Sequence, residues 1–270
     1  YVDDPDDPVK TVGGGNMIVM NPNGDGRKSQ GQMNLADPTL APYTMNRPGV
    51  IQFSSVPITE ANGYPGDSLS IIGFPRVVLY AKSNPAGTSN GFTDSDFFVR
   101  ILDVYPPDIN GVVKQYFVVE GCINARARVY ALSIADGAED DNAPFANMQI
   151  GALHYLKFQM MPIAYTWGAG HKIKVLISSS NHPRYQANPN LPINDGEFFL
   201  RQPLDGRGYM FNGQMMYPRK AVQRIAISDI YASNIELPVY SNAYVGVEEE
   251  QDNINSAIDM LIYPNPVSDN

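Results

Sequence analysis

Hydrophobic and polar residues alternate along the middle of the chain, and this pattern predicts β-strands. In "HKIKVLISSS", Ile173, Val175 and Ile177 fall on one face of an extended segment, while Lys172 and Lys174 fall on the other. A second run, "HYLKFQM", has the same two-residue period, with an apolar face made of Leu156, Phe158 and Met160. Two antiparallel sheets packed face to face require this alternation.

Further segments of this kind are short, rich in β-branched and aromatic residues, and bounded by Gly, Pro, Asn or Asp. No amphipathic helix longer than about three turns is apparent. The predicted strands lie within residues 50–58, 67–83, 95–105, 111–121, 123–133, 152–165, 171–180 and 223–230. The pattern therefore predicts an all-β sandwich over residues 50–240.

The regions outside the sandwich have a different character. Residues 1–49 contain an acidic, Pro-broken stretch and a long aperiodic segment, which we expect to form a connector and an irregular loop packed on the sandwich. Residues 241–260 are acidic and aperiodic, as is typical of a linker. The chain begins with Tyr and has no signal-peptide core, so we expect it to be a piece of a longer polypeptide.

Composition narrows the function. The chain of 270 residues has 23 Gly and 22 Pro, which favours turns and short strands over long helices. The net charge of −9, without any Lys/Arg cluster, disfavours nucleic-acid binding, and no apolar run approaches the ~20 residues of a membrane span. The single cysteine, Cys122, excludes an intramolecular disulfide, and its place in a predicted strand suggests a buried thiol.

Two serine motifs suggest a nucleophile, and both have a simpler interpretation. "GTSNG" around Ser89 has the spacing of a nucleophile elbow, but a strand follows it where the elbow requires a helix. The run Ser178–Ser180 lies near His182, but a triad also needs a carboxylate behind the histidine, and Pro183 constrains this segment. We therefore predict no catalytic residue in this chain.

Metal and cofactor sites are not expected either. The stretch "NPNGDGRKSQGQ" has too few carboxylates for a calcium loop and ends in Gln32 instead of the bidentate glutamate. The three histidines show no metal-binding spacing. Asp96 and Asp103 lie seven apart on one predicted strand, about 23 Å along it, so they cannot form an acid–base pair. We expect them to anchor loops by pairing with arginines, the candidates being Arg100, Arg126 and Arg128.

Several of these segments, in order, resemble one known family. "SDFFVRILDVYPPDING", "VEGCINARARVYA", "WGAGHKIKVLISSSNHPRYQANPN" and "ASNIELPVY" look like the C-terminal domain of X-prolyl dipeptidyl peptidases, cocaine-esterase-like enzymes and glutaryl acylases. The opening "DDPDDPVKTVGGG" resembles the connector of that family. Mild departures from the family pattern occur at Ser95, Asn124, Lys172 and His182.

The resemblance implies a jelly-roll sandwich of the galactose-binding-like type, packed beside an upstream α/β-hydrolase domain that carries the Ser–Asp–His triad. This chain would be an accessory domain that shapes the active-site cleft and stabilises its catalytic neighbour. Its expected structural and domain-docking residues are Asp96, Asp103, Arg126, His171, Ser180, Arg184 and Tyr185. Exposed apolar surface for docking is expected from residues 21–49 and 181–192.

The last ten residues carry a second resemblance. "LIYPNPVSDN", residues 261–270, is similar to the first strand of the type IX secretion sorting domain of Bacteroidetes. This similarity implies a secreted or cell-surface protein.

Two other functions remain open at this stage. A jelly roll can be a carbohydrate-binding module, and the aromatic candidates for stacking on sugar are Trp167, Tyr43, Tyr64, Tyr80 and Tyr209. The chain can also be a surface adhesion domain without any catalytic partner. Fold analogy alone does not choose among these functions.

Overall fold

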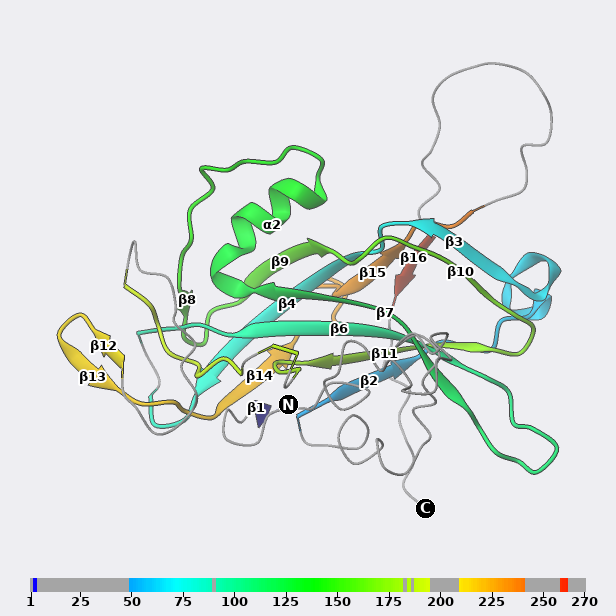
Figure 1. The fold of residues 1–270 in the computed structure, drawn as a ribbon, viewed down its shortest axis with the longest axis horizontal. Helices are drawn as coiled ribbons and strands as arrows, with labels where there is room; N and C mark the ends of the chain where they lie inside the picture. Colours follow the sequence, from blue (N-terminus) through cyan, green and yellow to red (C-terminus); the bar gives the residue numbers. More distant parts are fainter. Residues whose placement is uncertain are drawn as a thin grey trace, which may run out of the picture.

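The protein folds as an antiparallel β-sandwich with two main sheets (Figure 1), which confirms the predicted all-β class. The structure is a computed structural model, and it describes residues 2–3, 49–88, 91–181, 184–185, 187–194, 209–240 and 258–261. Among these residues, no helix has the length and apolar character needed to cross a membrane.

The first sheet has the strand order β1-β14-β4-β15-β16, and β9 also pairs with β4. Its strands are β1 (Val2–Asp3), β4 (Arg76–Pro85), β9 (His154–Gln159), β14 (Ala221–Ile225), β15 (Asn234–Leu237) and β16 (Ile258–Leu261). Both ends of the chain thus contribute a strand to this sheet. The strand β16 spans the predicted boundary between the linker and the sorting domain, and it pairs with β15.

The second sheet has the order β2-β11-β6-β7, and all its pairs are antiparallel. Its strands are β2 (Ile51–Ser54), β6 (Asp96–Val104), β7 (Gln115–Asn124) and β11 (Lys172–Ser178). A register shift between Ile101 and Leu102 marks a bulge in the β6–β7 pair.

Shorter elements close the sandwich. Three two-stranded pairs are formed by β3 (Leu69–Gly73) with β10 (Ile163–Trp167), β5 (Phe92–Thr93) with β8 (Met148–Gln149), and β12 (Tyr209–Phe211) with β13 (Gln214–Met216). The described helical segments are η2 (Glu60–Asn62), η3 (Pro65–Asp67), η4 (Ala125–Ala127) and α2 (Arg128–Ala135).

The core lies between the two main sheets, where the predicted alternation is confirmed. Ile173, Val175 and Ile177 on β11 are 1–3% exposed, and they meet apolar side chains of the first sheet, including Val77 and Leu79 on β4. The apolar face of "HYLKFQM" is equally buried and belongs to the same cluster: Leu156, Phe158 and Met160. Burial of these faces is the main force that holds the sheets together.

The strand expected over residues 123–133 is wrong. Strand β7 ends at Asn124, and the chain continues through η4 into α2, which contacts β9 and β7 (Figure 1). The sequence "RVYALSIA" contains good helix formers and lacks a two-residue alternation. Gly137 follows with a φ of 75° and donates its N–H to the Ile134 carbonyl, which ends the helix.

The prediction of a buried thiol is also wrong. Cys122 does lie in β7, but its side chain is exposed. It pairs across the strands with Phe98 and therefore faces away from the core, which the sequence pattern of a strand buried on both faces does not reveal.

Candidate functional site

The outer face of the second sheet carries buried polar groups, and we take it as the candidate site. Along β6, Phe97, Val99 and Ile101 point into the core, while Phe98 and Arg100 point outward. Arg100 is nevertheless 1% exposed. Arginine is rarely buried to this degree unless it is paired, so we expect partners for the Arg100 guanidinium on this face.

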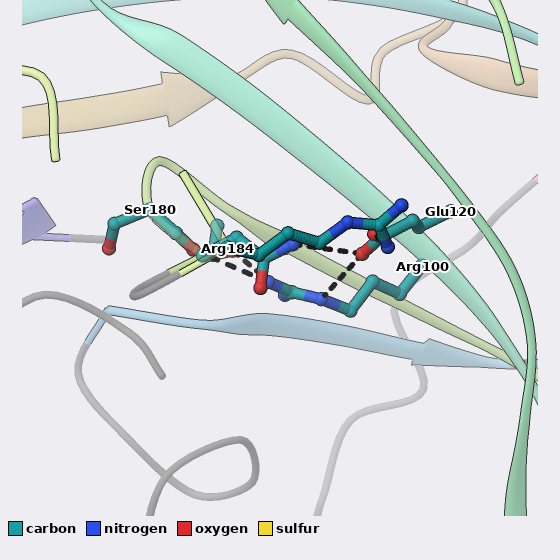
Figure 2. Close-up of polar contacts among 6 residues, drawn as sticks. Arg100, Glu120, Ser180 and Arg184 are labelled. Atoms are coloured by element: carbon teal, nitrogen blue, oxygen red, sulfur yellow. Dashed lines mark hydrogen bonds and ion pairs between the residues drawn. The ribbon is translucent and has the colours of Figure 1, made fainter. Parts of the chain in front are cut away.

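Arg100 belongs to a charge cluster with Glu120 and Arg184 (Figure 2). Glu120 lies opposite Arg100 in the β6–β7 pair, with 3.6 Å between Arg100 Nε and Glu120 Oε2, and the Arg184 guanidinium donates to the other carboxylate oxygen. Arg100 also donates to Ser178 Oγ at 3.0 Å and to the Ser180 carbonyl at 3.3 Å. Burial, together with the Arg184 charge, lowers the pKa of Arg100 to about 10.

This cluster fixes the chain just after β11. Asn181 donates its side-chain amide to Glu120 Oε2 at 2.9 Å, and its backbone carbonyl accepts the N–H of Tyr185 at 3.0 Å. The Tyr185 ring packs on Phe98 with 5.1 Å between the centroids. One carboxylate thus joins two sheet strands to the following loop, and these charge-assisted bonds give the loop a defined position.

A second polar group lies where β6 begins; we call it the amide group, and it consists of Asp94, Asp96, Asn124, Asn188 and Asn190. Asn124 donates to Asp94 Oδ2 at 2.6 Å and to Asp96 Oδ1 at 2.9 Å, and Asn188 donates to the same two oxygens at 2.9 and 3.1 Å. Asn190, with a φ of 58°, accepts the Ser95 hydroxyl at 2.7 Å. Residues 187–194 are thereby bound to the sheet.

These bonds correct one expectation about exposed surface. Ala187, Asn188, Asn190 and Leu191 are all buried, so the described part of residues 181–192 does not supply exposed apolar surface. The contacts of the Asn188 amide with Asp94 and Asp96 hold this segment against the sandwich. Residues 21–48 lie outside the described part of the chain.

A third group lies at the other end of β6. Asp103 accepts from Tyr165 Oη at 2.8 Å, and His171 Nδ1 lies 2.8 Å from Asp103 Oδ1. The Tyr105 ring packs on His171 with 4.1 Å between the centroids. Burial raises the pKa of Asp103, while the bonds from Tyr165 and His171 act in the opposite direction.

This histidine–aspartate pair does not extend to a triad. Within the described residues, no serine hydroxyl contacts the His171 ring. Ser89 and His182 lie outside the described residues. Asp103 pairs with a tyrosine and a histidine, so the expected arginine partner is wrong for this residue.

The other predicted residues fall into separate places. Ser180, Arg184 and Tyr185 come together at the charge cluster, whereas Asp96 lies in the amide group. Arg126 lies apart in η4, where it is 7% exposed and its Nε has no hydrogen-bond partner among the described residues.

Sequence reasoning missed Glu120, Tyr165 and Asn188. Glu120 did carry a signal, because it is a lone charge inside the apolar run "YFVVEG". Asn188 lies in "NPN", which is typical of any exposed turn, so nothing in the sequence indicates its burial.

An open pocket lies beside the charge cluster, with a volume of about 450 Å³. Its lining residues are Asp96, Phe98, Cys122, Ile123, Asn124, Arg184 and Tyr185. The described residues contain no group of three or more His, Cys, Asp or Glu side chains placed to hold a metal ion.

A comparison with known families covers most of the chain. Residues 20–219 match the family described as the X-Pro dipeptidyl-peptidase C-terminal non-catalytic domain. The chain belongs to this family. The match includes the charge cluster, the amide group and the Asp103–His171 pair, and it makes the chain an accessory domain. No curated protein gives a significant sequence match.

Two solved structures share the fold. An aminopeptidase from a marine sediment Thaumarchaeota archaeon aligns with a TM-score of 0.55 at 20% identity, covering 89% of this chain and 33% of the other. An α-amino acid ester hydrolase labelled with selenomethionine aligns with a TM-score of 0.56 at 24% identity, covering 89% of this chain and 32% of the other. The chain therefore spans about a third of the length of each of these relatives.

Proposed function

We propose that this chain borders the active-site cleft of an α/β serine hydrolase domain and stabilises that domain. The observation that carries the proposal is that the chain belongs to a family of non-catalytic C-terminal domains. The chain also spans about a third of the length of two hydrolytic relatives. The catalytic partner would be upstream in the same polypeptide. It would supply the nucleophile, base and oxyanion hole for ester or amide cleavage through an acyl-serine.

The charge cluster and the amide group support a role in shaping a cleft. A domain that limits substrate size must present a surface of fixed shape. The loop after β11 is bound to the sheet through Arg184 and Glu120, and residues 187–194 are bound through Asn188. Fixed polar contacts of this kind reduce the conformational freedom of the surface that would line the cleft.

The parent polypeptide, produced with and without residues 50–240, tests this role. We expect removal to lower the thermal midpoint of the catalytic part and to change kcat/KM more for large substrates than for small ones. A reading frame without an upstream α/β-hydrolase region would overturn the proposal. So would a catalytic part whose stability and substrate range do not change.

We also propose that the parent protein is exported to the cell surface or beyond. The support is the similarity of residues 261–270 to a type IX sorting domain. Cell fractionation with an antibody against residues 50–240 tests this, and signal confined to the cytosolic fraction would contradict it.

Carbohydrate binding is a second candidate function, favoured by one surface feature. The ring centroid of Tyr80 lies 5.2 Å from that of Tyr155 and 5.4 Å from that of Tyr231. Tyr155 is 39% exposed and Tyr231 is 45% exposed. Trp167, in contrast, is fully buried and cannot stack on a sugar. A glycan array probed with the chain and with Tyr155→Ala tests this function; saturable binding lost in the variant would favour it.

A further inference from the structure

Four large apolar side chains are exposed on segments that adjoin at one corner: β3 with the turn after it, the turn before β10, and the segment after β15. Ile72 is 57% exposed, Phe74 49%, Met161 65% and Tyr240 53%. We refer to these four residues as the corner patch. Single exposed apolar residues are ordinary, whereas several on adjoining segments can form an interaction surface.

Backbone hydrogen bonds bring the three segments of the corner patch together. The turn that carries Phe74 is bound to the turn that carries Met161, since Met160 donates its N–H to the Pro75 carbonyl at 2.8 Å. Ile72 donates to the Pro238 carbonyl at 3.0 Å. Tyr240 donates to the Ser70 carbonyl at 2.8 Å.

The backbone of the corner patch is also restricted. Gly73 has a φ of 130°, and a Cβ at that position would lie 3.4 Å from Pro238 Cβ. Strand β3 pairs with β10 along its whole length, from Leu69 opposite Trp167 to Gly73 opposite Ile163. A preformed apolar surface loses little conformational entropy when a partner covers it.

The chemistry of the corner patch fits a protein partner. Methionine and aromatic side chains are enriched in protein interfaces, and charged groups are depleted from the centre of such interfaces. The patch contains no charge, and the exposed Arg76 lies just beyond it at the start of β4. A sugar would require several hydrogen-bonding side chains, and the patch supplies only the Tyr240 hydroxyl.

We propose that the corner patch is the surface through which this domain contacts the catalytic α/β domain of its parent polypeptide. This inference rests on the proposed function. We name the α/β domain as the partner because the chain spans about a third of the length of the two relatives, so most of such a polypeptide lies outside this chain. An uncharged, preformed apolar surface suits a lasting contact between domains.

Binding of the chain to the separately produced α/β domain from its own reading frame, measured by calorimetry, tests the inference. Ile72→Thr and Met161→Ser should each weaken binding about tenfold or more, as for residues central to an interface. Ile109→Ser is the matched control, because Ile109 is 101% exposed in the β6–β7 hairpin, away from the patch. The control should bind within about twofold of the unchanged chain. Thermal unfolding of each variant checks that the fold is retained.

The outcomes separate this inference from the proposed function. If the α/β domain binds and both patch variants bind as tightly as Ile109→Ser, the corner patch is not the contact, while the accessory role stands. If the chain is a dimer by light scattering and the patch variants are monomers, a second copy covers the patch and the inference is wrong. Absence of an α/β domain from the reading frame overturns both.

Discussion

Glu120 holds the buried charge of Arg100, and its loss should destabilise the fold. Arg100 is 1% exposed, and in Glu120→Gln it would lose the carboxylate that lies beside it. Removing one partner of a buried pair costs about 3–5 kcal/mol, so we expect the free energy of unfolding to fall by about 3 kcal/mol. Urea denaturation followed by circular dichroism measures this.

The matched control for this change is Asp136→Asn. Asp136 pairs with Lys157 at 2.7 Å, but its side chain is 48% exposed. A surface pair contributes about 0–1 kcal/mol, so the control should change little. Equal losses in the free energy of unfolding of the two variants would show that burial does not increase the contribution of the Glu120–Arg100 pair.

Lys174 should make stability rise with pH above neutrality. Burial lowers its pKa to about 8, whereas an unfolded lysine titrates near pH ~10.4. Between these values the unfolded chain binds more protons than the folded chain, so the free energy of unfolding increases as pH rises through about 8. Lys174→Met should lack this increase between pH 7 and 9.5 in urea denaturation. If the free energy of unfolding of Lys174→Met rises with pH as steeply as that of the unchanged chain, Lys174 does not cause the increase.

At the scale of elements, β7 packs closely at Gly121 against Met160, the residue that follows β9. A Cβ on Gly121 would lie 3.0 Å from Met160 Cγ and 3.1 Å from Met160 Cα, which is part of the backbone. Gly121→Ala must therefore push the chain after β9 away from β7. We expect a loss of about 1–3 kcal/mol in the free energy of unfolding.

Gly168→Ala is the control for this packing argument. A Cβ there would meet the His171 ring at 3.6 Å, an ordinary contact. The variant should stay within about 0.5 kcal/mol of the unchanged chain. If both alanine variants unfold at the same urea concentration, the close approach of β7 to the Met160 segment does not limit side-chain size.

At the scale of the whole molecule, we expect the isolated chain to have no hydrolase activity. Its family is non-catalytic, and the described His171 is bound to Asp103 without a serine contact. The chain should neither hydrolyse p-nitrophenyl acetate above background nor react with a fluorophosphonate probe. Probe labelling that Ser89→Ala abolishes would show that "GTSNG" is a true nucleophile site.

Local patterns determined the sheet content and much of the core. The two-residue period identified which faces of β9 and β11 are buried, because side-chain direction in a strand depends only on position. The strand expected over residues 123–133 rested on residue composition and not on this period, and a short helix follows β7 there. That segment lacks the alternation and contains good helix formers, and the helix packs against β9.

The sequence by itself determined the all-β class and the family resemblance. Only the tertiary structure decided that Glu120 lies between Arg100 and Arg184, and that Asn188 reaches Asp96. These partners are 20 to 92 residues apart in the sequence. Alternation fixes the face on which a side chain lies, but strand order and register fix its neighbour, and those depend on the whole fold.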